Sequence, residues 1–455
     1  MRIQSVLLAV LIPMSPLLFA EEATEDPFAA LDRLLEDNFN SIDLTLDEQF
    51  EILNQAMEDG YQRLSEEVAE NWGSNEVQLP TKTTWVDYSE DLSVRRMIDF
   101  ELGTVSIERI INVDDKVAAI VRDIATASEA LQTDNLADLA DKDTALKYAK
   151  ETLETKGLEI VEPDHTDAKE APVLADLSQS VAPALLEDVV NQALGLDQMA
   201  NEMLEPRDAN VPSPPFVASV APLANNKRKV SIQIPLKANF KHLLADEYLA
   251  TVAHEAEKQN LPPSLLLAVM ETESHFNPRA RSAVPAYGLM QLVPRSGAMD
   301  AYEKVYGEKT LLGPEYLYQP DNNTELGAAY LHILHNRYLR HITDPDSLQY
   351  CAIAAYNTGA GNVAKSFTGA TNVRVAAKII NTMTPNEVYA HLQENLPYEE
   401  TRRYIVKVTE AQKKYFAFDE VVLQNITKDA VAARRNTETN LLRYVGAQQT
   451  SGPQL

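Results

Sequence analysis

The stretch from Leu261 to Gln291 (LPPSLLLAVMETESHFNPRARSAVPAYGLMQ) restricts the possible folds of this chain more than any other. Its two adjacent prolines suit the entry turn of a helix, and Ser264 can cap it. Apolar residues then recur at the spacing that covers one helical face, namely Leu265, Leu266, Val269 and Met270. A proline disfavours the α conformation of the residue before it, so Asn277-Pro278 should end the helix. We therefore predict a helix that buries one apolar face.

Two carboxyl groups, Glu271 and Glu273, fall in the last turns of this predicted helix. The helix macrodipole is negative there, which disfavours a carboxylate anion and tends to raise its pKa, as a general acid requires. Conventional glycosidases place two carboxyl groups on opposite sides of the scissile bond. Residues two apart on a helix do not face each other, so these two cannot be that pair. One carboxyl would have to act alone, or its partner must come from far away in the chain.

Length and charge limit the class of protein. At 455 residues and 45% hydrophobic side chains, the chain can bury substantial cores, and its length suggests two or three domains. The 68 acidic side chains outnumber the 40 basic ones, giving a net charge of −28. This excess argues against nucleic acid or an anionic membrane surface as the main ligand. The single cysteine, Cys351, cannot form an intramolecular disulfide.

Residues 1–20 (MRIQSVLLAVLIPMSPLLFA) predict a secretory signal peptide, with an uncleaved anchor as the alternative. Arg2 precedes a short apolar run that two prolines interrupt, and Ala20 comes before an abrupt acidic change at Glu21. No cysteine lies near this segment to carry a lipid. After Ala20, no apolar run approaches the roughly 20 residues that a membrane-spanning helix needs. We therefore expect an exported protein without a transmembrane span after removal of the signal.

Alternating apolar and polar residues between 77 and 113 predict a small antiparallel sheet, with a turn at Leu102-Gly103. Residues 229–236 (KVSIQIPL) alternate again and should return to that sheet as a further strand. We expect residues 72–236 to form an α+β N-terminal accessory domain.

Three segments around the predicted sheet differ from it in composition and hydrophobic pattern. Residues 21–71 are acidic, with apolar residues at helical spacing that predict two amphipathic helices. Residues 114–156 predict a helical run. Scattered prolines between 162 and 223, densest near 205–223, favour a loop-like, irregular passage.

The second half of the chain predicts a compact all-α domain over residues 237–416, followed by a polar tail over 417–455. Apolar stripes indicate helices at 239–258, 321–340, 349–355, 371–380, 385–393 and 400–417. The fold class is therefore α+β, with a smaller N-terminal domain that carries the sheet and a helical C-terminal domain.

The sequence gives little support for a metal site. His254-Glu255 begins like a zinc-binding HExxH motif, but Lys258 stands where the second histidine should be. His332 and His335 share a helix face, and two histidines alone do not make a metal site. We expect no metal and no cofactor.

Several short blocks of the second half stand in a fixed order: Glu273-Ser274, Phe276-Asn277-Pro278, Gly288-Leu289-Met290-Gln291, Ala355-Tyr356-Asn357 with Gly359 and Gly361, and Glu400-Thr401-Arg402 with Tyr404. In this order and spacing they resemble the soluble lytic transglycosylase domain. Upstream, WGSNEVQLP and TWVDYSEDLSVRRMIDFELGTVSIERI resemble the membrane-bound lytic murein transglycosylase C family and its N-terminal domain, as does AAKIINTMTPNEVY downstream. The resemblance covers roughly Trp72 to Tyr415, with residues 21–70 and the tail outside it.

The resemblance implies a lysozyme-like fold for the C-terminal domain and a non-hydrolytic reaction on peptidoglycan glycan strands. Such enzymes cleave the β-1,4 bond between N-acetylmuramic acid and N-acetylglucosamine and leave a 1,6-anhydromuramyl end. Glu273 would serve as the single acid and base, which resembles the substrate-assisted exception to the two-carboxylate rule. The alternatives are a lysozyme-type hydrolase and a catalytically inactive peptidoglycan-binding protein.

The resemblance also implies substrate-binding roles. Ser282 would bond the sugar near its N-acetyl group, Met290 and Gln291 would line the glycan groove, Asn357 would hold its loop, and Tyr356 and Tyr404 would approach the catalytic carboxyl. Glu271 is expected to be an exposed or helix-terminal carboxylate without a catalytic role.

Two departures from the family pattern concern anchoring and one sugar contact. Close relatives are lipoproteins held through an N-terminal cysteine, which has no counterpart here. We therefore expect a periplasmic protein, with peripheral association with the outer membrane or the cell-wall machinery left open. Pro285 and Tyr287 also stand where relatives often carry smaller or polar residues, so contacts to one sugar should differ.

Overall fold

The computed structural model describes residues 27–112, 114–158, 160, 183–195 and 216–419. Contacts divide the chain into two units, Met1–Asp47 and Glu48–Leu455. The first unit contributes only the beginning of one helix to the described residues. The predicted signal peptide and nearly all of the predicted tail lie outside them.

Helix α1 (Pro27–Trp72) is continuous, so the prediction of two separate helices in this segment is wrong. No proline occurs between residues 28 and 72, and the first glycine after Pro27 is Gly60, so nothing in the sequence forces a break. Gly60 allows close packing on the helix over Thr144–Lys156, because a Cβ atom there would lie 2.4 Å from the Ala145 carbonyl oxygen. The helix ends at Trp72, whose indole donates a hydrogen bond of 2.7 Å to the Leu92 carbonyl.

Five antiparallel strands form one sheet in the order β1-β2-β3-β5-β4. The strands are β1 (Thr84–Tyr88), β2 (Val94–Asp99), β3 (Thr104–Ile111), β4 (Val217–Pro222) and β5 (Arg228–Pro235). The predicted sheet and its returning strand β5 are confirmed. Strand β4 lies in the passage predicted to be irregular, which is wrong for these residues. It is an edge strand, where a proline such as Pro222 is tolerated.

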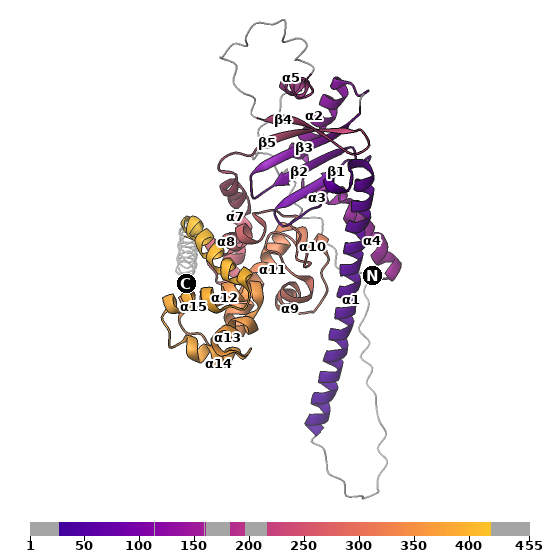
Figure 1. Ribbon diagram of the computed structural model, residues 1–455. Coiled ribbons are helices and arrows are strands. Elements are labelled where there is room, and N and C mark those ends of the chain that lie inside the picture. Colours follow the sequence, from indigo (N-terminus) through magenta and orange to yellow (C-terminus); the bar gives the residue numbers. More distant parts are fainter. Residues whose placement is uncertain (1–26, 113, 159, 161–182, 196–215, 420–455) are drawn as a thin grey trace, which may run out of the picture. The chain divides into compact units, whose positions relative to one another are not determined.

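Helices α2 (Val117–Thr133), α3 (Leu136–Asp141), α4 (Thr144–Lys156) and α5 (Pro183–Ala193) complete the N-terminal domain. Helix α2 packs on β2, β3 and α5, and α5 also contacts β4 (Figure 1). The helical run predicted over 114–156 breaks into three helices because Asn135 and Asp143 cap new helix starts with their side chains. Helix α5 was not predicted, since it lies in the proline-containing passage.

The sheet carries buried ion pairs on neighbouring strands. Arg95 on β2 binds Glu108 on β3, which also accepts a 2.7 Å hydrogen bond from Ser231 on β5. The next residue, Arg96, binds Asp87 on β1. Successive residues of a strand point to opposite faces, so the two arginines lie on opposite faces of the sheet.

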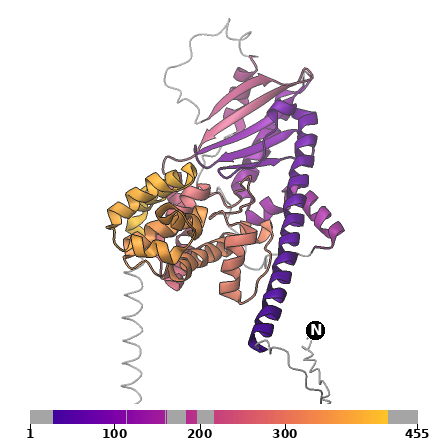
Figure 2. The same cartoon turned by 60° about the horizontal axis from the view of Figure 1, so that its bottom comes forward.

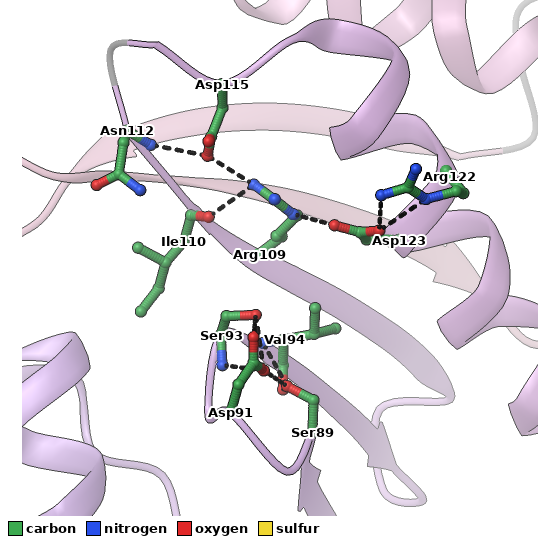
Figure 3. Close-up of polar contacts among 10 residues, drawn as sticks. All are labelled: Ser89, Asp91, Ser93, Val94, Arg109, Ile110, Asn112, Asp115, Arg122 and Asp123. Carbon is green, nitrogen blue, oxygen red and sulfur yellow. Dashed lines mark hydrogen bonds and ion pairs between the residues drawn. The ribbon is translucent and has the colours of Figure 1, made fainter.

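Figure 3 shows a third cluster in this domain, at the end of β3. The Arg109 guanidinium lies between the carboxylates of Asp115 and Asp123, at 2.9 Å and 2.8 Å. In the turn between β1 and β2, the carboxylate of Asp91 accepts hydrogen bonds from the hydroxyls of Ser89 and Ser93. Because Arg109 pairs with Val94 at the start of β2, both sets of contacts lie at the same end of the sheet.

The second half of the described chain is helical, as predicted, and Figure 2 shows its helices gathered in one group. They are α7 (Phe240–Gln259), α8 (Pro263–Ser274), α9 (Met299–Tyr306), α10 (Pro314–Tyr318), α11 (Pro320–Ile333), α12 (Pro345–Thr358), α13 (Ala360–Thr368), α14 (Val373–Ile380), α15 (Pro385–Asn395) and a last helix over residues 399–419. The α+β fold class is confirmed. A continuous hydrophobic core joins the sheet, α2, α7 and α8.

Candidate active site

Helix α8 carries the two candidate carboxyl groups and is buried along almost its whole length. Every residue from Pro263 to Ser274 is buried apart from Thr272, so the prediction of a single buried face is too narrow. The predicted cap is also different. Ser264 lies inside the first turn, and Asp419 from the last helix accepts hydrogen bonds from its backbone N–H at 2.8 Å and its hydroxyl at 2.7 Å. A carboxylate at this position complements the positive end of the helix dipole.

The C-terminus of α8 comes three residues before Asn277-Pro278, which was predicted to end it. His275 and Phe276 adopt left-handed backbone conformations, with φ of 53° and 65°, and reverse the chain there. The Ser274 hydroxyl donates a 2.7 Å hydrogen bond to the Leu289 carbonyl and fixes the returning loop. Glu273 therefore lies in the last turn of the helix, directly before the reversal.

The Glu273 side chain is only 7% exposed. Burial raises the pKa of its carboxyl above the ordinary value of 4.5. Lys82 from the N-terminal domain acts in the opposite direction, with its ammonium 3.6 Å from Oε2, and the nearby Tyr404 hydroxyl also lowers the pKa. Glu400 raises it further. The balance is a buried carboxyl that keeps its proton to a higher pH than a free glutamate does.

A cavity of about 370 Å³ opens onto Glu273, and both domains line it. Lys82, Thr83 and Glu101 come from the N-terminal domain, with Glu101 on the turn between β2 and β3. The remaining lining residues belong to the helical domain: Thr272, Glu273, His275, Asn357, Glu399, Glu400, Arg403, Tyr404 and Lys407. The cavity thus combines one buried acid with charged groups of both signs.

Three of the predicted site residues lie around the Glu273 carboxyl. The Tyr404 hydroxyl is buried and makes no hydrogen bond of normal length to any described residue, although it is near enough to lower the pKa of Glu273. Tyr356 on α12 is also close to Glu273 electrostatically, and its hydroxyl donates a 2.8 Å hydrogen bond to the Met290 carbonyl. Asn357 lines the cavity and accepts a 2.7 Å hydrogen bond from the Thr401 hydroxyl.

Met290 and Gln291 lie beside the site but point into the protein. The Met290 side chain is fully buried, packed against Gly327 of α11. Gln291 donates through its amide to the carbonyls of Ala280 and Gly288, at 3.0 Å and 3.1 Å. Both side chains therefore support the loop after α8 in this structure.

Gly288 and Ser282 belong to the same loop. Gly288 has φ of 76°, and a Cβ atom there would lie 2.2 Å from the Leu317 carbonyl oxygen, so the position excludes a side chain. The half-buried Ser282 bonds within its own turn, with its hydroxyl donating to the Val284 carbonyl. Ser282 is not among the residues that line the cavity.

Glu271 is buried rather than exposed, and it lies in the last turn of α8, so it matches the helix-terminal alternative of the prediction. Its side chain is 8% exposed and accepts hydrogen bonds of 2.8 Å from both Lys414 and the Tyr415 hydroxyl. Burial alone would raise the pKa of this carboxyl, but these two partners outweigh it and lower the pKa. The macrodipole argument therefore fails for Glu271, because specific partners dominate over the position on the helix.

Sequence reasoning missed Lys82, Glu101 and His275 as cavity residues. His275 has a depressed pKa through burial, and its Nδ1 atom has no hydrogen-bond partner among the described residues. It directly follows the Glu273-Ser274 motif, so its proximity could have been inferred. Lys82 and Glu101 have no such signal, because the sheet domain approaches the site from more than a hundred positions away in sequence.

The described residues contain no group of three or more His, Cys, Asp or Glu side chains placed to hold a metal ion. None of the helices in the described ranges combines the length and apolar character needed to cross a membrane.

Two family models match the chain. Residues 250–379 match the transglycosylase SLT domain. Residues 49–149 match the N-terminal domain of membrane-bound lytic murein transglycosylase C. The second match begins inside α1, so the later part of the acidic segment belongs to the similarity, which sequence analysis placed outside it.

Relatives are similar to this chain over most of its length. Membrane-bound lytic murein transglycosylase C from Mannheimia succiniciproducens is 30% identical over 358 residues, covering 77% of this chain and 87% of the relative. The protein of the same name from Klebsiella pneumoniae subsp. pneumoniae is 33% identical, covering 76% and 85%.

Among solved structures, an inactive mutant of the lytic transglycosylase Slt from Pseudomonas aeruginosa is 28% identical with a TM-score of 0.28, covering 39% of this chain and 24% of that one. The 70 kDa soluble lytic transglycosylase from Escherichia coli is 16% identical with a TM-score of 0.30, covering 66% and 44%.

Proposed function

The chain belongs to the membrane-bound lytic murein transglycosylase C family, and from that premise we propose that it cleaves peptidoglycan glycan strands without water, through Glu273. The observation that carries the proposal is the burial of Glu273 at the wall of a cavity, with a raised carboxyl pKa. A carboxyl that keeps its proton to a higher pH than a free glutamate does is suited to act as a general acid.

The reaction has two steps that share one carboxyl. Glu273 gives its proton to the glycosidic oxygen between N-acetylmuramic acid and N-acetylglucosamine as the bond from that oxygen to C1 breaks. The resulting positive charge at C1 is supported by the N-acetyl oxygen of the same sugar, as in other substrate-assisted reactions. The Glu273 carboxylate then takes the proton of the C6 hydroxyl while that oxygen bonds to C1. The product is a 1,6-anhydromuramyl end, and the acid is regenerated.

The other predicted site residues take supporting roles in this proposal. Tyr404 and Tyr356 flank the carboxyl, and Asn357 lines the cavity where the sugar would bind. Ser282 contacts the sugar near its N-acetyl group once a ligand replaces its bond to Val284. Met290 and Gln291 form the wall behind the groove.

A lysozyme-type hydrolase is the second candidate, and one observation favours it. Glu400 lines the same cavity and acts on Glu273 electrostatically, so the fold brings a second carboxylate, 127 positions away in the sequence, close to the first. In that case Glu400 would activate water, as the base of an inverting glycosidase does.

Mass spectrometry of the muropeptides released from purified peptidoglycan decides between these reactions. Non-hydrolytic cleavage gives products lighter by one water than hydrolysis does. We expect the lighter products from the native protein, and from a Glu400→Gln variant as well. Reducing-end products that disappear in Glu400→Gln would establish the hydrolase instead, and binding of the glycan without any release would indicate a binding protein.

We also propose export to the periplasm with peripheral attachment to the outer membrane, because the relatives are named membrane-bound. Fractionation of cells that express the full chain tests this proposal. Recovery with outer-membrane vesicles, and release by salt, is the expected result, whereas recovery in the cytoplasm would contradict it.

A further inference from the structure

We propose that Lys82, a residue of the N-terminal domain, belongs to the catalytic centre, where its ammonium group stabilises the carboxylate form of Glu273 between the two proton transfers. The inference rests on the proposed function of Glu273 as acid and base. In this view the accessory domain takes a direct part in the reaction, and residues of both domains form the active site.

The first support is the distance between the two charges. Lys82 Nζ lies 3.6 Å from Glu273 Oε2, which is an ion pair slightly longer than a hydrogen bond. Glu273 is 7% exposed and Lys82 is 41% exposed, so the carboxyl is buried while the ammonium lies at the mouth of the cavity. The ammonium can therefore stabilise the Glu273 carboxylate while it stays partly hydrated.

The second support is that the backbone around Lys82 is held by the loop that follows the catalytic helix. The Asn277 amide donates to the Lys82 carbonyl at 3.3 Å, and the Arg281 backbone N–H donates to the Thr81 carbonyl at 3.2 Å. On the other side, the Phe100 N–H donates to the Thr83 carbonyl at 2.8 Å. Lys82 is thus fixed between the sheet and the chain reversal after Glu273.

That loop is attached to the N-terminal domain at two further points. Arg279 is 5% exposed and forms an ion pair of 2.6 Å with Asp143, the cap of α4. The Arg281 guanidinium lies over the Tyr61 ring of α1 at 3.8 Å from its centre. These contacts restrain the position of Lys82 relative to Glu273, so their ion pair depends on the docking of the two domains.

Lys82 is also the cation with the strongest action on Glu273, because no other cation stands among the main influences on the pKa of that carboxyl. The remaining charged or titratable groups that face the carboxyl or line its cavity are Glu101, His275, Tyr356, Glu399, Glu400, Arg403, Tyr404 and Lys407. Of the other cations, Arg403 is already paired with Glu399 on its own helix. Lys407 is exposed to solvent.

The proposed role follows from the charge balance of the reaction. When Glu273 protonates the leaving oxygen, a buried carboxylate is left, and such an ion is costly without a partner. Lys82 offsets that cost and keeps the carboxylate available until it removes the C6 proton. No water, metal or other reactant enters the step, and the proton returns to Glu273 at its end.

A pH profile of kcat/KM, measured by release of soluble muropeptides, tests the proposal with Lys82→Met, Lys82→Arg and a matched control, Lys147→Met. Lys147 is an exposed lysine on α4 and does not line the cavity. Since the free enzyme needs protonated Glu273, kcat/KM falls as pH rises above the pKa of that group. Removing a nearby cation raises this pKa, so the alkaline limb should move upward.

We expect Lys82→Met to move the alkaline limb up by about one pH unit and to lower kcat at neutral pH about tenfold. Lys82→Arg should keep the limb near its native position, and Lys147→Met should match the native protein throughout. Lys82→Gln provides a second neutral replacement should the methionine variant not fold. An unchanged limb in a folded, neutral variant would overturn the proposal.

A carbon-13 NMR titration of the glutamate carboxyl groups separates this inference from the proposed function. The Glu273 signal is assigned by its absence in Glu273→Gln. If the native protein releases no product, the proposed function fails, and the Glu273 titration still tests the ion pair. A Glu273 pKa that is the same with and without the Lys82 ammonium would then overturn the inference.

Discussion

The sheet of the N-terminal domain and the end of helix α8 both bury charged side chains, but they treat them differently. In the sheet, Glu108 is bound by Arg95 and by the Ser231 hydroxyl, and Lys229 lies 3.2 Å away. Burial alone would raise the pKa of Glu108, yet these partners lower it. At α8, the polar partners of Glu273 among the described residues are Lys82, 3.6 Å away, and the nearby Tyr404, and its pKa is raised.

The difference separates buried charges that hold the fold from buried charges that are available for chemistry. A buried ion needs several good partners to recover its lost hydration, and a group with such partners is fixed in one protonation state. A group with fewer partners changes its protonation more easily, and these groups cluster at functional sites. Glu108 belongs to the first kind and Glu273 to the second.

Glu271 sharpens the comparison, because it lies on the same helix as Glu273 and only two residues away. It is equally buried, but Lys414 and Tyr415 bind its two oxygens and lower its pKa. Helix position is nearly the same for both carboxyls, so the partners decide which of them can serve as an acid.

The largest predicted effect is on the sheet. Arg95→Met leaves Glu108 buried with less compensation, and we expect the free energy of unfolding to fall by about 3–5 kcal/mol. Arg122→Met is the matched control, since this arginine is 72% exposed and bound only to its neighbour Asp123 among the described residues. It should change stability by less than about 0.5 kcal/mol. Urea denaturation of both variants measures the effect. Equal free energies of unfolding for Arg95→Met and Arg122→Met would contradict the view that the buried ion pairs of the sheet hold the fold.

Glu271→Gln should destabilise the protein by about 2 kcal/mol near neutral pH, because it removes a carboxylate with two hydrogen-bond partners. The pKa of Glu271 is lowered in the folded state, so its contribution is present above the ordinary value of 4.5 and is lost as pH falls through the folded pKa. The gap between native and variant stability should therefore close in acid. Thermal unfolding over a range of pH checks this, and a gap that grows in acid would contradict it.

Tyr404→Phe tests a buried group that lacks a normal hydrogen bond. Removing its hydroxyl should leave stability nearly unchanged, because no bond of normal length to a described residue is lost. We expect kcat to fall about fivefold to tenfold, the value of one neutral hydrogen bond to the reacting carboxyl. Melting temperature and muropeptide release, measured together, give the answer. A large loss of stability with native turnover would contradict this prediction and show that Tyr404 stabilises the fold, as the buried charges of the sheet do.

The smallest predicted effect concerns the far end of α8. Asp419→Ala removes the cap from Ser264, and loss of such a cap costs about 1 kcal/mol. Turnover per folded molecule should not change, since the cap lies at the opposite end of the helix from Glu273. Loss of turnover without loss of stability would contradict this assignment.

Local patterns predicted the elements well where the signal lay within one element. The apolar stripes found α7, α8 and α11, and the alternation between 77 and 113 found three strands of the sheet. The prediction failed where a pattern was ambiguous. In the acidic segment two helices were predicted, although the sequence contains no helix-breaking residue there and one continuous helix forms. The prolines near β4 and α5 led to the prediction of an irregular passage where an edge strand and a short helix form.

The site was predictable only as far as the motif extends. Glu273, Tyr356, Asn357 and Tyr404 were named from sequence and lie together. What each carboxyl does depends on contacts from distant residues, which spacing along the chain cannot reveal. The pairing of Glu271 with Lys414 spans 143 positions and the cap by Asp419 spans 155, and the approach of Lys82 to Glu273 likewise joins two domains.

Turnover of peptidoglycan by Glu273→Gln and Glu271→Gln, measured side by side as the rate of muropeptide release per folded molecule, tests the central claim most directly. If Glu273, the carboxyl with fewer partners, is the acid and base, the rate of Glu273→Gln should fall by about 10²–10⁴-fold, the usual contribution of general acid–base catalysis. Glu271→Gln should retain native turnover once its lower stability is taken into account. Comparable turnover in the two variants, or a greater loss in Glu271→Gln, would contradict the account.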